Sequence, residues 1–186
     1  MAVGMALAER YLNAIVNIED KSSSLIDYYT YCLCGDGDLM EGISYEALSF
    51  ASAQNLNKLI LLYDKNNVSL DSDTKKTFTE DIEIRFEALD FNIINVKNGS
   101  DYKEISKAIK SAKKSDRPSI IICNTVIGKD SKLEGTNVVH GKPLDNEDLM
   151  NIRSKYKMTT EPFEIKKEVL DYLQNYINKR VSKKYL

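Results

Sequence analysis

The sequence predicts an α/β domain in which a doubly wound parallel sheet carries helices on both faces. Short apolar runs rich in Ile, Leu, Val and Tyr alternate along the chain with amphipathic segments of helical period. Runs of this kind are typical of strands that are joined by right-handed βαβ crossovers and buried on both sides. The length of 186 residues suits one domain with a proper core and is short for two.

The first predicted unit is a helix followed by a strand, a glycine turn and a second helix. Apolar residues at helical spacing predict the first helix over 2–16, and no Ser, Thr, Asp or Asn precedes it as a cap. We therefore expect the sequence to be a piece of a longer protein. The run YYTYCLC at 28–34 predicts a strand that ends at Gly35-Asp36-Gly37, and 42–55 predicts the next helix.

The same alternation continues further along the chain. Apolar runs predict three more strands, at 58–64, 91–97 and 119–128. Amphipathic segments between them predict helices, at 78–90 and 101–114. Thr79 is the expected N-cap of the first of these helices, and Asp101 with Glu104 is expected to form a capping box on the second. A charged amphipathic helix is expected from Pro162 onward.

Composition and charge argue against several classes of protein. The net charge is -2 and no basic stripe precedes the tail at 179–184, which argues against nucleic acid and anionic membranes as partners. The apolar stretch near the start is interrupted by Glu9 and Arg10, so it is neither a membrane span nor a signal peptide. The three cysteines lack the paired spacing of a zinc site and predict free, buried thiols in a cytoplasmic protein.

Three polar residues are expected at one edge of the sheet. Asp36 follows the first strand, Asn66 follows the second, and His140 lies in the long loop that follows the fourth. In open parallel sheets, ligands bind beyond the carboxyl ends of the strands. Long loops without secondary structure are also usually tied to function. This edge is therefore the predicted site.

The turn Gly35-Asp36-Gly37 favours a metal site. Its glycines let a ligand approach the backbone closely, and the helix from Gly42 is expected to point free amides at the same place, which attracts an anion. An aspartate there repels that anion unless a divalent cation lies between them. Mg2+ prefers hard oxygen ligands together with phosphate oxygens and water. The Asp36 carboxylate, the Asn66 amide oxygen and the carbonyl near Val68 are candidate ligands of a Mg2+ ion that holds a diphosphate.

Other loop motifs do not match this turn. An EF-hand loop that began at Asp36 would need Asp or Asn at the position of Met40 and Gly at the position of Glu41. The Gly-Lys-Ser/Thr ending of a Walker loop is absent, and the dinucleotide pattern GxGxxG fails at Met40. A plain strand-to-helix turn explains an isolated GDG about equally well. The pairing with Asn66 favours the metal site.

Several stretches resemble one enzyme family. The triplet GDG, followed after 28 residues (Asp38 to Lys65) by Asn66, resembles the thiamine diphosphate motif. Six stretches resemble transketolases in order and spacing between Ala2 and Phe163, namely AVGMALAERYL, GDGDLMEGISYEALSFA, LILLYDKNNVSLD, RFEAL, PSIIICNTVIG and GTNVVHGKPL. The related deoxyxylulose-phosphate synthases share GDG but generally lack the MEG and HG-P elements.

The resemblance implies a cofactor and the residues that hold it. Transketolases use thiamine diphosphate with Mg2+, and Ca2+ is an alternative metal. Asp36, Asn66 and the Val68 carbonyl correspond to the family's metal ligands, and the Gly37 amide corresponds to a contact with the diphosphate. These assignments agree with the ligands expected from the residues themselves.

The resemblance also implies roles for a histidine and two glutamates. His140 corresponds to a catalytic histidine that reaches the cofactor diphosphate and the sugar substrate. Glu41 and Glu46 correspond to acidic residues of a network at the dimer interface. Without the resemblance, His140 is equally well explained as an ordinary exposed loop histidine, and the glutamates as ordinary acids of a helix.

An activity follows from the same resemblance. Transketolases transfer a two-carbon ketol unit from a ketose phosphate to an aldose phosphate in the pentose phosphate pathway, as homodimers. Residues 1–163 correspond to an N-terminally truncated diphosphate-binding domain, and 164–186 to a helical extension toward a pyrimidine-binding domain that this sequence lacks. We therefore expect no ketol transfer by this chain alone. The alternatives are the diphosphate subunit of a split enzyme and a metal-diphosphate binding domain without activity.

The loop before His140 departs from the family pattern. After Ile127-Gly128, KDSKLE replaces the FGSPNK-like stretch that is common in the family, and the loop is shorter. We therefore expect the approach to His140 to differ from that in other members.

Overall fold

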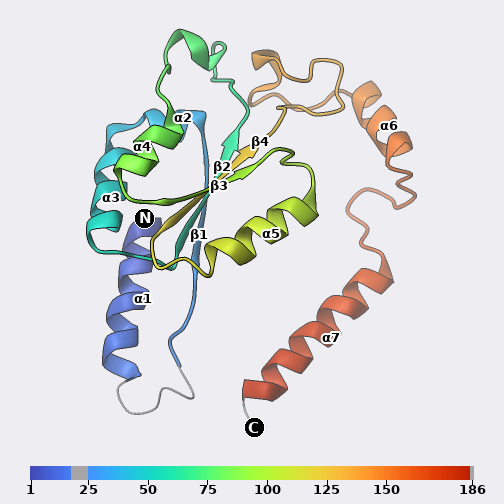
Figure 1. The fold of residues 1–186 in the computed structure, drawn as a ribbon. Coiled ribbons are helices and arrows are strands. Elements are labelled where there is room, and N and C mark those ends of the chain that lie inside the picture. The colour runs from blue at the N-terminus through green and yellow to red at the C-terminus, as the bar shows by residue number, and fades with distance from the viewer. Residues whose placement is uncertain (18–24, 185–186) are drawn as a thin grey trace. The chain divides into compact units, whose positions relative to one another are not determined.

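The computed structural model describes residues 1–17 and 25–184 (Figure 1). The chain divides into two compact units, Met1–Pro143 and Leu144–Leu186. The first unit contains the sheet. The second contains the helices α6 (Asn146–Lys155) and α7 (Lys167–Lys184).

The sheet of the first unit is parallel throughout. Its strands are β1 (Thr30–Gly35), β2 (Leu59–Lys65), β3 (Asn92–Val96) and β4 (Ser119–Asn124). Their spatial order is β1-β2-β4-β3. The register places Tyr63 of β2 beside Cys34 on one side and Ile122 on the other. The predicted strands are confirmed, and their carboxyl ends meet at one edge of the sheet.

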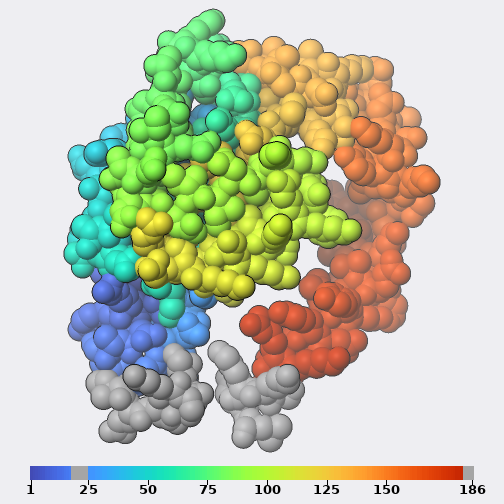
Figure 2. All heavy atoms as spheres, in the orientation of Figure 1, coloured from blue at the N-terminus to red at the C-terminus, as the bar shows by residue number. Residues whose placement is uncertain are grey.

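Helices cover both faces of this sheet. Those on one face are α1 (Ala2–Val16), α3 (Gly42–Ala53) and α4 (Ile82–Ala88), and α5 (Tyr102–Ala112) packs on the other. In β2, Leu61 and Tyr63 point to the first face and Ile60 to the second, because successive side chains of a strand alternate. In the space-filling view, the yellow-green atoms of α5 lie at the front of the first unit (Figure 2). The predicted doubly wound α/β class is confirmed.

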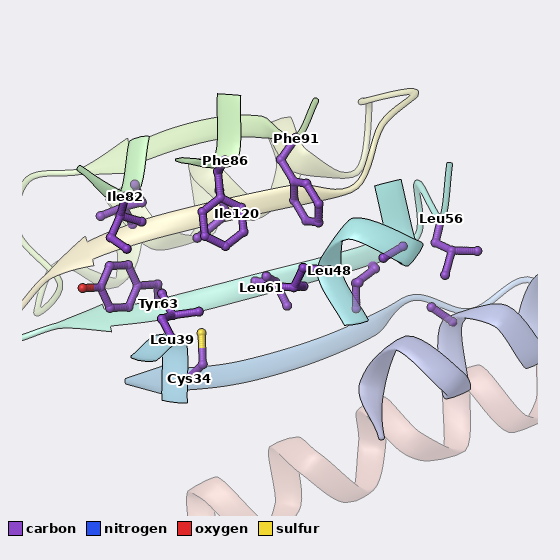
Figure 3. Close-up of a cluster of buried hydrophobic side chains, with 14 residues drawn as sticks. Cys34, Leu39, Leu48, Leu56, Leu61, Tyr63, Ile82, Phe86, Phe91 and Ile120 are labelled. Carbon is purple, nitrogen blue, oxygen red and sulfur yellow. The ribbon is translucent and has the colours of Figure 1, made fainter. Parts of the chain in front are cut away.

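The larger core lies between the sheet and the helices α3 and α4 (Figure 3). Phe86 of α4 is fully buried and meets Phe91 edge to face, with ring centroids 5.1 Å apart. Burial of each such ring contributes about 1.5 to 3 kcal/mol to stability. The ring of Tyr63 lies near Ile82 and Leu39 in this core, and its hydroxyl points toward the carboxyl end of the strands. The core therefore fixes the direction in which Tyr63 reaches.

On the α5 face of the sheet, two side chains of β1 are exposed within the described part of the first unit. Cys32 and Cys34 point toward the larger core, whereas Tyr31 and Leu33 point to the opposite face and are exposed, Leu33 by 77%. β1 is also the edge strand of the described sheet. An apolar edge strand that is open to solvent tends to pair with another chain.

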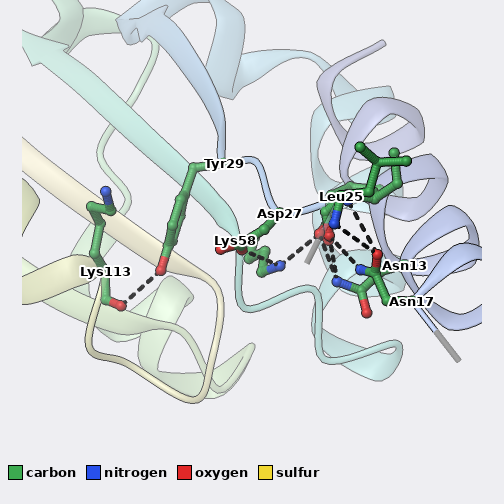
Figure 4. Close-up of polar contacts among 9 residues, drawn as sticks. Asn13, Asn17, Leu25, Asp27, Tyr29, Lys58 and Lys113 are labelled. Atoms are coloured by element: carbon green, nitrogen blue, oxygen red, sulfur yellow. Dashed lines mark hydrogen bonds and ion pairs between the residues drawn. The ribbon is translucent and has the colours of Figure 1, made fainter. Parts of the chain in front are cut away.

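A polar cluster joins α1 to the amino ends of the strands (Figure 4). The ammonium of Lys58 lies 2.6 Å from the carboxylate of Glu9, which is buried, and 2.8 Å from that of Asp27. Burial lowers the pKa of Lys58, but the hydrogen bonds to Asp27 and Glu9 outweigh it and raise the pKa above its ordinary value. In the same region, the Tyr29 hydroxyl donates to the Lys113 carbonyl at 3.0 Å.

One predicted helix cap is wrong and another is half right. α4 begins at Ile82 and is capped by Asp81, whose carboxylate accepts from the amides of the next turn at 2.9 and 3.2 Å, so Thr79 lies ahead of the helix. A carboxylate is favoured here because it also meets the positive end of the helix dipole. Asp101 caps α5 as predicted. The Glu104 carboxylate instead accepts from the amides of Lys97 and Asn98, so the reciprocal half of the capping box does not form.

Element lengths differ from the prediction beyond residue 124. β4 ends at Asn124 and not at Gly128, and the following loop contains a short 3-10 helix, Asn137–Val139. The helix α6 was not predicted; Asp145 caps it by accepting from the Asp148 amide at 2.8 Å. α7 begins at Lys167 and not at Pro162, because Phe163 has a positive φ of 67° that a helix does not allow. Among the helices that the structure describes, none is long and apolar enough to cross a membrane.

The cysteines are free thiols. Cys34 and Cys123 are buried as predicted, whereas Cys32 is half-buried. Burial, followed by the charge of Cys32, raises the pKa of Cys34 to about 12. Cys34 is therefore a neutral core residue at physiological pH and not a nucleophile.

Candidate metal and diphosphate site

Two of the predicted site residues meet at the carboxyl edge of the sheet. Asp36 directly follows β1 and Asn66 directly follows β2. Gly35 is paired with Asp64 in the register of the two strands, so the residues that follow them are neighbours. Asp36 is only 4% exposed. A carboxylate buried to this degree requires several hydrogen-bond donors around it.

The carboxylate of Asp36 has three such donors. The Tyr63 hydroxyl donates to Oδ1 at 2.6 Å. The backbone amides of Asn66 and Asn67 donate to Oδ2 at 3.2 and 3.0 Å. A carboxylate offers about four lone-pair positions. These contacts use three of them, and the remaining one, on Oδ1, is available to a metal ion.

Tyr63 remains protonated in this contact. Burial, followed by the hydrogen bond to Asp36, raises the pKa of the Tyr63 hydroxyl far above its ordinary value. The hydroxyl therefore acts as a donor to the Asp36 carboxylate over the whole physiological pH range.

The segment after β2 curls around Asp36. The side-chain oxygen of Asn66 accepts from the Val68 amide at 3.0 Å, and its amide nitrogen donates to the Asp64 carboxylate at 3.2 Å. Asn67 has a positive φ of 60°, and its carbonyl accepts from the Thr74 amide. The Asn66 side chain and the Val68 backbone therefore lie next to the two amides that donate to Asp36.

The donors at this edge fit a hard divalent cation. Asp36 Oδ1 has one lone pair left and Asn66 Oδ1 has a second one, and the turn that carries Asn66 and the Val68 carbonyl donates two amides to the Asp36 carboxylate. Mg2+ usually takes one or two carboxylates and fills its other positions with phosphate oxygens and water. In the part of the chain that the structure describes, no three His, Cys, Asp or Glu side chains gather into a metal cluster. These donors therefore suit a Mg2+ ion that is bound partly by the protein and partly by a phosphate ligand. They suit a metal bound by protein side chains alone less well.

A short helix that was not predicted carries the turn. α2 (Asp36–Met40) begins at the aspartate itself, so the first helical amides after β1 belong to α2 and not to the helix at Gly42. Gly37 lies in its first turn, where amides have no partner within the helix. A Cβ placed on Gly37 would meet nothing within 4 Å, so the backbone there is open to a ligand.

One side chain of α2 and side chains from two other helices hold α2 in place. The Asp38 carboxylate accepts from the Gly35 amide at 2.8 Å, and the Ser44 hydroxyl donates to the Asp38 carbonyl at 2.6 Å. Arg85 of α4 donates to the Leu39 carbonyl at 2.8 Å. Protein contacts alone thus hold the turn at both of its ends.

A polar cavity of about 320 Å³ adjoins Asp36. Tyr63 and Lys65 line it from β2, and Asp81 and Glu83 line it from the start of α4. The cavity gives the carboxyl edge of the sheet a hollow beside the candidate metal ligands.

His140 and the two glutamates stand apart from this cluster of contacts. His140 lies at the end of the 3-10 helix in the loop after β4, with its amide bound to the Asn137 carbonyl at 3.0 Å and its side chain exposed. Among the described residues, no hydrogen bond or ion pair joins His140 to Asp36 or Asn66. Glu41 and Glu46 are exposed, at the start of α3 and within it.

Sequence reasoning did not identify Tyr63, Asp64 and Arg85 as parts of the site. Tyr63 carried one signal, because it is the hydroxyl-bearing residue in an otherwise aliphatic run, LILLYD. Arg85 carried none, because its partner Leu39 is 46 residues away in the sequence.

Comparison with known proteins gives a consistent result. The family model described as "Transketolase, thiamine diphosphate binding domain" matches residues 1–185. The "Probable transketolase" of Streptococcus pneumoniae is 43% identical over 185 residues, which is 99% of this chain and 28% of the relative. A transketolase of Staphylococcus aureus is 45% identical over 184 residues, 98% of this chain and 28% of the relative.

Solved structures show the same similarity. Transketolase from Leishmania mexicana matches with a TM-score of 0.89 and 39% identity over 98% of this chain and 27% of that chain. Transketolase from Pichia stipitis in complex with sedoheptulose-7-phosphate matches with a TM-score of 0.91 and 33% identity over 99% of this chain and 28% of that chain. The present chain therefore spans between a quarter and a third of the length of these relatives.

Proposed function

The chain belongs to the transketolase family, and from this premise we propose that it is part of an enzyme that transfers a two-carbon ketol unit from a ketose phosphate to an aldose phosphate. The observation that carries the proposal is the contact of Asp36 with the turn at Asn66 and Asn67, which gathers oxygen donors at the carboxyl edge of the sheet. Such an edge is where open α/β sheets bind ligands.

The residues at this edge would hold the cofactor. We assign Asp36, Asn66 and the Val68 carbonyl to Mg2+, or to Ca2+ in its place, and the Gly37 amide to the diphosphate. Thiamine diphosphate, when bound, supplies a nucleophilic carbon and an electron sink. The buried, hydrogen-bonded Asp36 provides a fixed negative charge, which supports the assignment to a cation.

His140 is the candidate for contact with the diphosphate and the sugar. Its exposed side chain lies in the long loop that follows β4, whose carboxyl end is at the same edge of the parallel sheet as those of β1 and β2. We propose sugar phosphates as substrates, since a structure from Pichia stipitis contains sedoheptulose-7-phosphate. The pentose phosphate pathway and a cytoplasmic location follow as parts of the same proposal.

The organisation of the whole protein is also a proposal. We propose a homodimer in which Glu41 and Glu46 contribute to the interface, and the exposed apolar side chains beside them, Ile43 and Tyr45, support a buried role for this surface. We assign 1–163 to the diphosphate-binding domain and 164–186 to a helical extension. On this assignment the chain alone catalyses no ketol transfer, because a second domain must bind the rest of the cofactor.

Calorimetric titration tests the proposed site. Thiamine diphosphate with Mg2+ is titrated into the chain, into Asp36→Ala and Asn66→Ala, and into Asp116→Ala, which removes an exposed acid outside the site. We expect heat of binding in the unchanged chain and in Asp116→Ala, and none in the two site variants. Equal heat in all four proteins would refute the roles given to Asp36 and Asn66.

A further inference from the structure

We propose that two consecutive residues of β2, Tyr63 and Asp64, are positioning residues that orient the two side-chain ligands of the metal. Tyr63 contacts Asp36, and Asp64 contacts Asn66. The inference rests on the metal site of the proposed function and adds residues that are not themselves ligands. Because successive side chains of a strand point to opposite faces, one strand end reaches both ligands from opposite sides.

Tyr63 fixes the carboxylate of Asp36. Tyr63 is 1% exposed and packs with Ile82, Leu39 and Phe86, so its hydroxyl has little freedom to move. That hydroxyl donates to Oδ1 at 2.6 Å, and this is the oxygen that keeps a lone pair for a cation. The contact therefore sets the direction in which the remaining lone pair points.

Asp64 fixes the side-chain amide of Asn66. The Asp64 carboxylate accepts from the Thr125 hydroxyl of the segment after β4 and from the Asn66 amide nitrogen, the latter at 3.2 Å. The nitrogen and the oxygen of an amide lie on opposite sides of its carbon. Anchoring the nitrogen at Asp64 therefore turns the oxygen away, toward the Val68 amide at 3.0 Å and the turn around Asp36.

These two contacts matter for metal binding if they fix the orientation of the ligands before the metal enters. A metal site gains affinity when its ligands are fixed before binding, since less side-chain freedom is lost when the metal enters. Loss of groups that orient metal ligands typically lowers metal affinity by about 10- to 100-fold. We expect a loss in this range for each of the two contacts.

The test is the affinity for Mg2+ at saturating thiamine diphosphate, measured by calorimetry on the chain and its variants. Tyr63→Phe removes one hydroxyl and keeps the ring, and Asp64→Ala removes the anchor of Asn66. Tyr29→Phe is the matched control, because that hydroxyl binds the Lys113 carbonyl at the opposite end of the sheet. Asp64→Asn should restore affinity, since its amide oxygen still accepts from Asn66 while its nitrogen donates to the Thr125 hydroxyl.

The outcomes separate the inference from the function on which it rests. About tenfold or greater loss in Tyr63→Phe and Asp64→Ala, with affinity kept in Tyr29→Phe and Asp64→Asn, supports the inference. Unchanged affinity in Tyr63→Phe and Asp64→Ala overturns it and leaves the metal site standing. No Mg2+ binding by the unchanged chain overturns the metal site itself, and the inference with it. Thermal unfolding without metal is recorded for each variant, and if Tyr63→Phe fails to fold, the pair Asp64→Ala and Asp64→Asn decides.

Discussion

Replacement of Arg85 by Met tests whether α4 holds the turn that carries Asp36. The Arg85 side chain is 15% exposed, and its guanidinium donates at 2.8 Å to the carbonyl of Leu39 in the last turn of α2. It also pairs with Glu80 at 2.8 Å and lies 5.7 Å from the ring centre of Tyr45 and 5.8 Å from that of Phe78. Methionine keeps an apolar stem of similar length and removes every polar contact.

The expected loss follows from these contacts. A hydrogen bond from a charged donor contributes about 1.5 to 3 kcal/mol. The ion pair adds at most about 1 kcal/mol, because Glu80 is 49% exposed and solvent screens it. Each aromatic contact adds about 0.5 to 1 kcal/mol, part of which the methionine retains. We therefore expect Arg85→Met to lower the free energy of unfolding by about 2 to 4 kcal/mol.

Chemical denaturation measures this loss, and a second arginine provides the control. Arg117 pairs with Asp90 at 2.5 Å, but both side chains are largely exposed, so Arg117→Met should cost less than about 1 kcal/mol. If Arg85→Met costs no more than Arg117→Met, Arg85 does not hold α2 and the reasoning is refuted. A larger loss that leaves the unfolding slope unchanged confirms it.

Three further predictions concern the rest of the first unit. Lys58→Met leaves the buried carboxylate of Glu9 without its cation and should cost about 3 to 5 kcal/mol in chemical denaturation. The raised pKa of Cys34, about 12, means that the folded state keeps its proton while the unfolded thiol loses it. Stability should therefore fall as pH rises from about 9 toward 12, with a shallower slope in Cys34→Ala. Leu33→Lys should reduce self-association in analytical ultracentrifugation, because it places a charge on the exposed face of an edge strand.

Each of these predictions has a result that contradicts it. If Lys58→Met lowers the free energy of unfolding by less than about 1 kcal/mol, the buried carboxylate of Glu9 does not need the ion pair. If stability falls with pH equally steeply in the unchanged chain and in Cys34→Ala, groups other than Cys34 cause the loss of stability at alkaline pH. Sedimentation of Leu33→Lys identical to that of the unchanged chain would show that β1 is not the surface through which copies associate.

Local patterns were sufficient for the fold class and for the meeting of Asp36 with the turn at Asn66. Apolar runs and helical periods predicted all the strands of the sheet, because their information lies within a few neighbouring residues. The rule for parallel sheets then placed Asp36 and Asn66 at one edge, and the structure brings them into contact. The roles given to these residues, to His140 and to the glutamates remain predictions.

Local patterns failed where the tertiary structure selects between residues that suit the same position, and where an element is very short. Thr79 and Asp81 are both acceptable caps by type, and the backbone path into α4 selects Asp81. The short helix α2 has too few residues for a period to show. Its last turn is contacted by Arg85, which no rule of spacing connects to Leu39.

The sequence by itself determined the order of the strands and of the helices between them, the turn at Asp36 and the edge at which Asp36 and Asn66 meet, because each depends on residues that are neighbours in the chain. Only the tertiary structure decided which groups hold Asp36 and Asn66. Tyr63 lies 27 residues from Asp36, and Thr125 lies 61 residues from Asp64. Contacts over such separations exist only after the sheet has assembled, because the pairing of β1, β2 and β4 brings these side chains within hydrogen-bond distance.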